Sequence, residues 1–226
     1  MKNLRLKQVT FTGVDNDTNL HELQKIQKDY PIAEFGVLVT KNWAHNPRCL
    51  DPEHIPLLGA FDLNLSCHLC GELAREALNN NFKNTLELVK TFEVFKRCQL
   101  NVSREKTDDE LVIDVPDTLE ELIIQQPSAD NCKLFFKIKD RRKMTVLIDG
   151  SGGKGIETEL KPLKADFKVG YAGGLNADNI KATVSQLFAS KDVGDFWVDM
   201  ETGCRTDNKF DLEKVVKVLK QFEKFV

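Results

Sequence analysis

Three glycine-rich segments in the second half of the chain carry the residues best suited to bind an anion. They are residues 149–155 (DGSGGKG), Gly173-Gly174 and Thr202-Gly203. Glycine lets backbone N–H groups approach a phosphate closely, and a threonine hydroxyl can donate a further hydrogen bond. A helix that begins near Ile180, just after the second segment, would add partial positive charge. These segments therefore favour a phosphate site, although simple tight turns would use the same glycines.

Asp149 is the strongest candidate for acid–base chemistry. It ends the apolar run 143–149 and directly precedes the first glycine cluster. In a barrel of parallel strands, a carboxylate at the carboxyl end of a strand faces the active site and is often catalytic. A capping role in the loop is the alternative. The cluster is not a nucleotide-binding P-loop, because it lacks the Gly-Lys-Ser/Thr ending.

The segment Cys67-His68-Leu69-Cys70 has the cysteine spacing of a zinc or redox site. No second cysteine or histidine pair follows at a matching distance, and a strand would send Cys67 and Cys70 to opposite faces. We therefore predict no metal here. His68 would be a candidate base if its side chain pointed into the barrel, whereas a packed histidine is the simpler expectation.

The elements that must position these residues are short apolar runs that alternate with helical patterns. The helical spacing of apolar residues predicts helices over residues 19–30, 72–79, 85–92, 118–126 and 211–226. Eight runs read as strands, over residues 7–14, 33–40, 63–70, 97–103, 133–139, 143–149, 167–172 and 195–200.

Alternation of strands and helices predicts a parallel sheet covered by helices. Eight units fit a single (β/α)8 barrel domain over residues 1–226, and a doubly wound open sheet is the competing architecture. Two helices are expected to be reduced. No room for one exists between residues 139 and 143, and the stretch after Arg48 has little helical pattern.

Composition limits the classes of partner. The formal net charge is -3, so no overall basic field exists to collect nucleic acid. No apolar run approaches the roughly 18 residues of a membrane span. The first residues show no apolar export signal, and six cysteines are too sparse for a disulfide scaffold. We therefore expect a cytoplasmic protein with reduced thiols and a small-molecule substrate.

Several segments together resemble the phosphoribosylanthranilate isomerase family, from the first strand to the last. They are LIDGSGGKG, YAGGLNADNI, WVDMETG with the closing helix, RCQLN, and the arginine-containing segment NPRCLDPE. The resemblance implies a (β/α)8 barrel and an Amadori rearrangement of an aminoaldose to an aminoketose in tryptophan biosynthesis. It implies no metal and no organic cofactor.

The resemblance also implies roles for individual residues. Asp149 falls on the general acid, Arg48 on a contact near the anthranilate carboxylate, and Asp199 on a substrate-side position. The phosphate-binding loops fall on Gly153, Gly173, Gly174, Thr202 and Gly203.

Thr12 stands where the family has the cysteine that acts as general base. A threonine hydroxyl keeps its proton near pH 7, so another group must act as the base. His68 or another inward base, or Asp149 acting alone, could do so in an aminosugar isomerase. A changed phosphorylated-sugar substrate and a non-catalytic phosphometabolite-binding protein are the other two hypotheses. The missing cysteine favours weak or absent phosphoribosylanthranilate isomerase activity.

Overall fold

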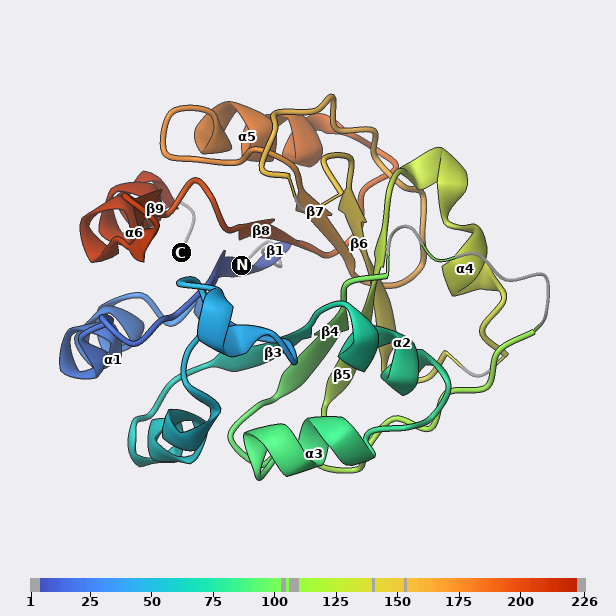
Figure 1. The fold of residues 1–226 in the computed structure, drawn as a ribbon. Helices are drawn as coiled ribbons and strands as arrows, with labels where there is room; N and C mark the ends of the chain where they lie inside the picture. The colour runs from blue at the N-terminus through green and yellow to red at the C-terminus, as the bar shows by residue number, and fades with distance from the viewer. Residues whose placement is uncertain (1–4, 103–104, 106–109, 140, 153, 223–226) are drawn as a thin grey trace.

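Eight parallel strands close into a barrel in chain order (Figure 1). The computed structural model describes residues 5–102, 105, 110–139, 141–152 and 154–222. β8 pairs with β1, with Val198 opposite Val9, and this pairing closes the ring. The strands are β1 (Leu6–Thr12), β2 (Ala33–Val39), β3 (Leu65–Leu69), β4 (Arg97–Leu100), β5 (Glu121–Gln126), β6 (Met144–Asp149), β7 (Val169–Ala172) and β8 (Phe196–Met200). The predicted (β/α)8 barrel is confirmed.

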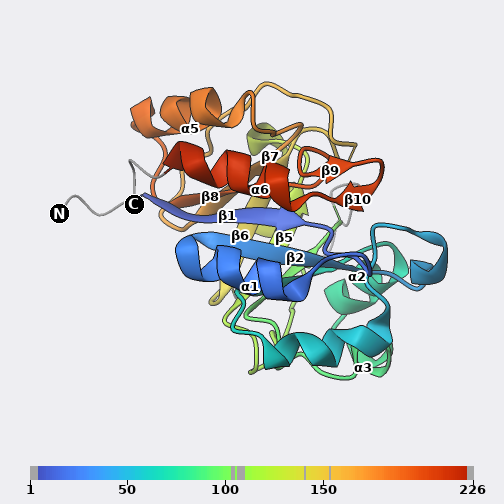
Figure 2. The ribbon, with the colours of Figure 1, turned by 90° about the vertical axis from the view of Figure 1, so that its left-hand side faces the viewer.

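Helices surround the strands on the outside (Figures 1 and 2). Asn19 and Asp211 cap α1 and α6, since each side chain accepts hydrogen bonds from backbone N–H groups in the first turn. No helix in the described part of the chain is long and apolar enough to cross a membrane. The helices are α1 (Leu20–Asp29), α2 (Glu72–Leu78), α3 (Lys83–Val89), α4 (Lys133–Phe136), α5 (Ile180–Ala189) and α6 (Leu212–Leu219).

Some strand connections lack a full helix. The connection from β2 to β3 holds only the 3₁₀ segments Trp43–His45 and Pro52–Ala60, as the sparse helical pattern after Arg48 indicated. Pro56 lies inside the second of these, where it cannot donate a backbone hydrogen bond. In the described residues between β6 and β7, 150–152 and 154–168, there is no helix either. This long loop reaches the site described below.

The fifth strand was predicted in the wrong place. Residues 133–139 were expected to be a strand, but Lys133–Phe136 form α4. Leu134, Phe135 and Ile138 are buried while Phe136 is exposed, which is the spacing of a helix face rather than alternation.

The segment 118–126, expected to be helical, supplies β5 instead. It lies between β4 and β6 in the ring, with Ile123 opposite Gln99 and Thr145. Pairing on both sides outweighs the helix propensity of its glutamate, leucine and glutamine residues.

A buried ion cluster lies at the amino-terminal end of the barrel strands. Arg97 donates to Glu34 at 2.7 Å and to Glu121 at 3.1 Å, and its guanidinium stacks over the Trp197 ring. Lys168 donates to Glu121 at 2.6 Å. These charges lie at the end of the strands opposite Asp149, where residues stabilise a barrel rather than catalyse.

Candidate functional site

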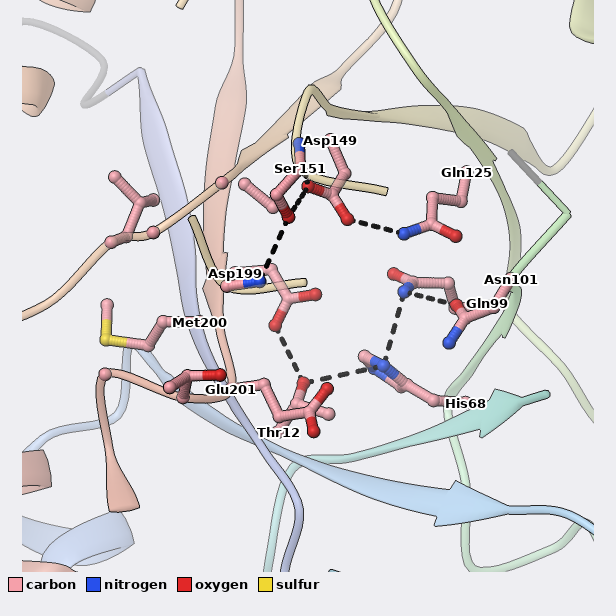
Figure 3. Close-up of a pocket in the computed structure, with 17 residues that line it drawn as sticks. Thr12, His68, Gln99, Asn101, Gln125, Asp149, Ser151, Asp199, Met200 and Glu201 are labelled. Carbon is pink, nitrogen blue, oxygen red and sulfur yellow. Dashed lines mark hydrogen bonds between the residues drawn. The ribbon is translucent and has the colours of Figure 1, made fainter. Parts of the chain in front are cut away.

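A pocket lies at the carboxyl end of the barrel (Figure 3). It contains polar side chains from β1, β3, β4, β5, β6 and β8. The structure brings together seven residues predicted from the sequence: Thr12, Asp149, Gly173, Gly174, Asp199, Thr202 and Gly203. Gly153 lies outside the described residues.

Asp149, the last residue of β6, is held in a fixed orientation. Its Oδ2 accepts a hydrogen bond from Gln125 Nε2 at 2.7 Å. Its Oδ1 accepts from the Ser151 hydroxyl at 2.7 Å and from the Ser151 backbone N–H at 3.0 Å. The carboxyl group is buried and lines the pocket, so it is placed to exchange a proton with a ligand there.

Asp199, on β8, is the second buried carboxyl group of the pocket (Figure 3). The Thr12 hydroxyl donates to its Oδ1 at 2.7 Å, and its Oδ2 accepts no hydrogen bond from the described residues. Burial raises the pKa of Asp199 to about 7, the Thr12 hydrogen bond opposes this, and the charges of Asp149 and Glu201 add to it. Asp199 is therefore ready to gain or lose a proton near neutral pH.

His68 points into the barrel but does not titrate near neutral pH. Ser66 Oγ lies 2.9 Å from its Nε2, and Gln99 Nε2 lies 3.3 Å from its Nδ1. Because an amide nitrogen only donates, Nδ1 accepts and the ring hydrogen lies on Nε2, toward Ser66. Burial, and to a smaller extent the charge of Arg97, lowers the pKa of His68 to about 3.

Gly36, on β2, leaves the space that the Thr12 and His68 side chains occupy. A Cβ at this position would lie 2.6 Å from Thr12 Oγ1 and 3.0 Å from His68 Nε2. Thr12 Oγ1 is 3.5 Å from His68 Nδ1, a longer contact than its hydrogen bond to Asp199. The hydroxyl is thus directed at Asp199.

The two predicted glycine turns lie against each other. Gly173 and Gly174 have φ of 120° and 67°, a backbone conformation that favours glycine. Asn176, after β7, forms a bridge with Gly203, after β8. α5 begins at Ile180, after the short segment 175–179 that follows the first turn.

The loop after β6 covers both turns. A Cβ on Gly155 would overlap the Thr202 side chain, and one on Gly174 would overlap the backbone of Glu157. A Cβ on Gly173 would overlap Thr158 Oγ1 of the same loop. All three glycine-rich segments therefore meet at one edge of the pocket, as a single anion site requires.

Arg48 reaches the pocket only through another side chain. Its Nη1 donates to Glu201 Oε1 at 2.7 Å, and its Nη2 donates to Asn208 Oδ1 at 3.3 Å. Glu201 lines the pocket, whereas Arg48 lies behind it. Arg48 therefore does not line the pocket with the other predicted site residues, and it contacts the pocket through its ion pair with Glu201.

The sequence interpretation missed four polar residues of the pocket: Gln99, Asn101, Gln125 and Glu201. Gln125 was missed because its segment was expected to be helical. Gln99 and Asn101 alternate along β4 and its extension, so a period-two pattern could have indicated that both point inward. Nothing in the sequence indicated that Glu201 would pair with Arg48.

Cys67 on β3 and Cys70, just after it, do not form a centre with His68. Cys67 lies beside Cys98 of the neighbouring strand, and Asn101 Nδ2 donates to Cys70 Sγ at 3.1 Å. Among the residues that the structure describes, no three His, Cys, Asp or Glu side chains are grouped to hold a metal ion.

No protein-family model and no curated protein matches this chain. Solved structures do match, and two of them are similar to this chain over nearly their whole length. One is N-(5'-phosphoribosyl)anthranilate isomerase from Pyrococcus furiosus, with a TM-score of 0.57, 16% identity, and coverage of 96% of this chain and 98% of that chain. The other is phosphoribosyl anthranilate isomerase from Thermococcus kodakaraensis, with a TM-score of 0.55, 13% identity, and coverage of 96% and 99%. At this level of identity the likeness shows a shared (β/α)8 barrel fold.

Proposed function

We propose that this protein catalyses a ring-opening aldose–ketose isomerisation of a phosphorylated aminosugar, of the phosphoribosylanthranilate isomerase type. The observation that carries the proposal is the pair of buried carboxyl groups, Asp149 and Asp199, in one pocket beside the glycine turns. An acid and a base that face one sugar ring are what the rearrangement needs. In the family that the sequence resembles, this reaction belongs to tryptophan biosynthesis.

Asp149 is the proton donor in this proposal. In its protonated form it donates to the ring oxygen of the sugar, the bond between that oxygen and carbon one breaks, and the nitrogen lone pair forms a protonated imine. Gln125 and Ser151 hold the carboxyl group while this happens. The phosphate, bound by backbone N–H groups of the turns at Gly173-Gly174 and Thr202-Gly203, fixes the other end of the sugar.

Asp199 is the proton acceptor, and Thr12 is its positioning residue. The carboxylate takes the proton from carbon two, and the electron pair of that bond forms an enolamine with the imine. A proton then adds to carbon one while the carbon-two hydroxyl loses its proton, which gives the ketone. A carboxyl with a pKa of about 7 suits this task better than His68, whose pKa of about 3 makes it a weak base.

The test uses freshly prepared N-(5'-phosphoribosyl)aniline and N-(5'-phosphoribosyl)anthranilate in D₂O, with the ketose product followed by NMR. Deuterium should enter carbon one of the product. Asp149→Asn keeps the shape of the side chain and loses the proton, so turnover should fall by about 10²–10⁴-fold. Turnover within tenfold of wild type would argue against the acid role. Tight binding of both compounds without any product would instead indicate a non-catalytic phosphometabolite-binding protein.

Thr12 gives a prediction for the pH profile. The base must be ionised, so kcat/KM should rise as the pH increases through about 7, the pKa of Asp199. The Thr12 hydrogen bond lowers that pKa. Thr12→Val removes the donor, so the rising limb should move to higher pH. An unmoved limb would show that Thr12 does not act through Asp199.

The variant Thr12→Cys distinguishes a site in which Asp199 is the base from a site in which the base is missing. If Asp199 already accepts the proton, the added thiol should change turnover by less than about tenfold. If the base is missing, the thiol should raise turnover by about 10²–10⁴-fold. The larger gain would overturn the role given to Asp199.

A further inference from the structure

We infer that the substrate of this pocket carries a phosphate but no carboxylate on its nitrogen substituent. The inference rests on the proposed function and narrows its substrate class. Phosphoribosylanthranilate carries such a carboxylate on its aryl ring, which would meet the acidic lining of this pocket. A phosphorylated aminosugar whose nitrogen bears a hydrogen, an alkyl group or an uncharged aryl group fits instead.

The first argument is the charge of the lining. Three carboxyl side chains face the pocket, from Asp149, Asp199 and Glu201. None of the described residues that line it is a lysine or an arginine, and His68 is buried and neutral. A ligand carboxylate would therefore enter a partly buried space lined by acidic side chains, with no lining lysine or arginine to neutralise it, which weakens binding.

The second argument is that the nearby cations are already paired. Arg48 makes an ion pair with Glu201 at 2.7 Å, and the two side chains are about equally shielded, at 30% and 28% exposure. Arg205 pairs with Asp15 at 2.7 Å, and both of these side chains are almost fully buried. A ligand carboxylate that took the place of Glu201 on Arg48 would leave Glu201 without its partner.

The third argument is the kind of polar group that the rest of the pocket offers to a ligand. The backbone turns at Gly173-Gly174 and Thr202-Gly203 provide dipoles for the phosphate without a side-chain charge. The amide side chains of Gln99 and Asn101 line the other part of the pocket. Neutral amides and carboxylates suit sugar hydroxyls and a neutral or protonated nitrogen.

The experiment compares two stable reduced probes that differ by one group. They are 1-anilino-1-deoxyribitol 5-phosphate and the same compound with an ortho-carboxylate on the ring, measured by titration calorimetry at pH 7.5. In wild type the carboxylate-free probe should bind at least about tenfold more tightly. Equal affinity, or tighter binding of the carboxylated probe, would overturn the inference while leaving an isomerase possible. If neither probe binds, both the proposed function and this inference fall.

A pair of variants tests the cause of the preference. Glu201→Gln removes one negative charge and leaves Arg48 uncompensated, so the preference for the carboxylate-free probe should shrink at least about tenfold or reverse. Glu72→Gln is the matched control, because Glu72 also pairs with a cation of a loop, Lys41, at 2.6 Å but does not line the pocket. The control should keep the wild-type preference. An equal change in both variants would overturn the role of the Arg48–Glu201 pair.

Discussion

Asp199→Asn should abolish most of the isomerase activity while making the folded protein more stable above neutral pH. Asparagine has nearly the same shape, and its amide oxygen can still accept the hydrogen bond that Thr12 donates to Asp199 Oδ1. It cannot accept a proton from carbon two. The loss of a positioned base lowers turnover by about 10²–10⁴-fold.

The gain in stability follows from the raised pKa of Asp199. The pKa in the folded state is about 7, against an ordinary value of 3.8, so the folded protein keeps the proton to a higher pH than the unfolded chain. The stability contribution of this group is therefore full below about pH 4 and is lost as the pH rises through 7. Above that pH the fold must hold a buried negative charge. The displacement of the pKa corresponds to about 4 kcal/mol at most, so a gain of roughly 2–4 kcal/mol is expected at pH 8.

Urea unfolding at pH 4 and pH 8 measures this effect. Asp199→Asn should exceed wild type at pH 8, and the difference should be far smaller at pH 4, where both side chains are uncharged in the fold. Asp195→Asn is the control, since Asp195 lies just before β8, is 51% exposed and makes an exposed pair with Lys7. Its effect should stay within about 1 kcal/mol at either pH. A gain for Asp199→Asn that is the same at both pH values would contradict a buried, titrating carboxyl.

Most of the barrel was predictable because its strands are buried on both faces. Seven of the eight expected strands overlap those observed. Runs such as those of β2 and β8 are buried along their whole length and are mostly apolar, so they stand out in the sequence. The fifth failed because Phe136 looks like part of a strand in the sequence but lies exposed on a short helix. The pairing with β4 and β6 that determines β5 depends on residues far away in the chain, so it cannot be recognised from the six residues of β5 alone.

The residues of the candidate site could be predicted only where a residue type suited to acid–base chemistry or anion binding lies at the carboxyl end of a strand. Asp149 and the glycine turns satisfied that condition, and the structure places them in one pocket. The relation between Thr12 and Asp199 was not predictable, because it joins the first strand to the last across the closure of the barrel. The Arg48–Glu201 pair was not predictable for the same reason, because it joins two loops that are far apart in the sequence. Such contacts depend on how the ring closes rather than on local pattern.

Gly174→Val should remove the phosphate-dependent part of ligand affinity. Gly174 has a φ of 67°, and a Cβ there would overlap the backbone nitrogen and Cα of Glu157, which cannot move as a flexible side chain would. Valine would therefore push the loop after β6 off the turn and change the direction of the backbone N–H groups. Each hydrogen bond to a charged group contributes about 1.5–3 kcal/mol, so losing even one costs about tenfold or more in affinity.

The measurement is the affinity ratio between 1-anilino-1-deoxyribitol 5-phosphate and its dephosphorylated form, which isolates the phosphate from the rest of the ligand. Gly71→Ala is the control for backbone strain, because Gly71 has a similar φ of 63° but nothing within 4 Å of an added Cβ. It should cost about 1–2 kcal/mol of stability and keep the wild-type ratio. Thr202→Val should lower the ratio only modestly, since backbone groups supply most contacts with the phosphate. A wild-type ratio in a folded Gly174→Val protein would show that the phosphate binds elsewhere, and the turns after β7 and β8 would then be structural alone.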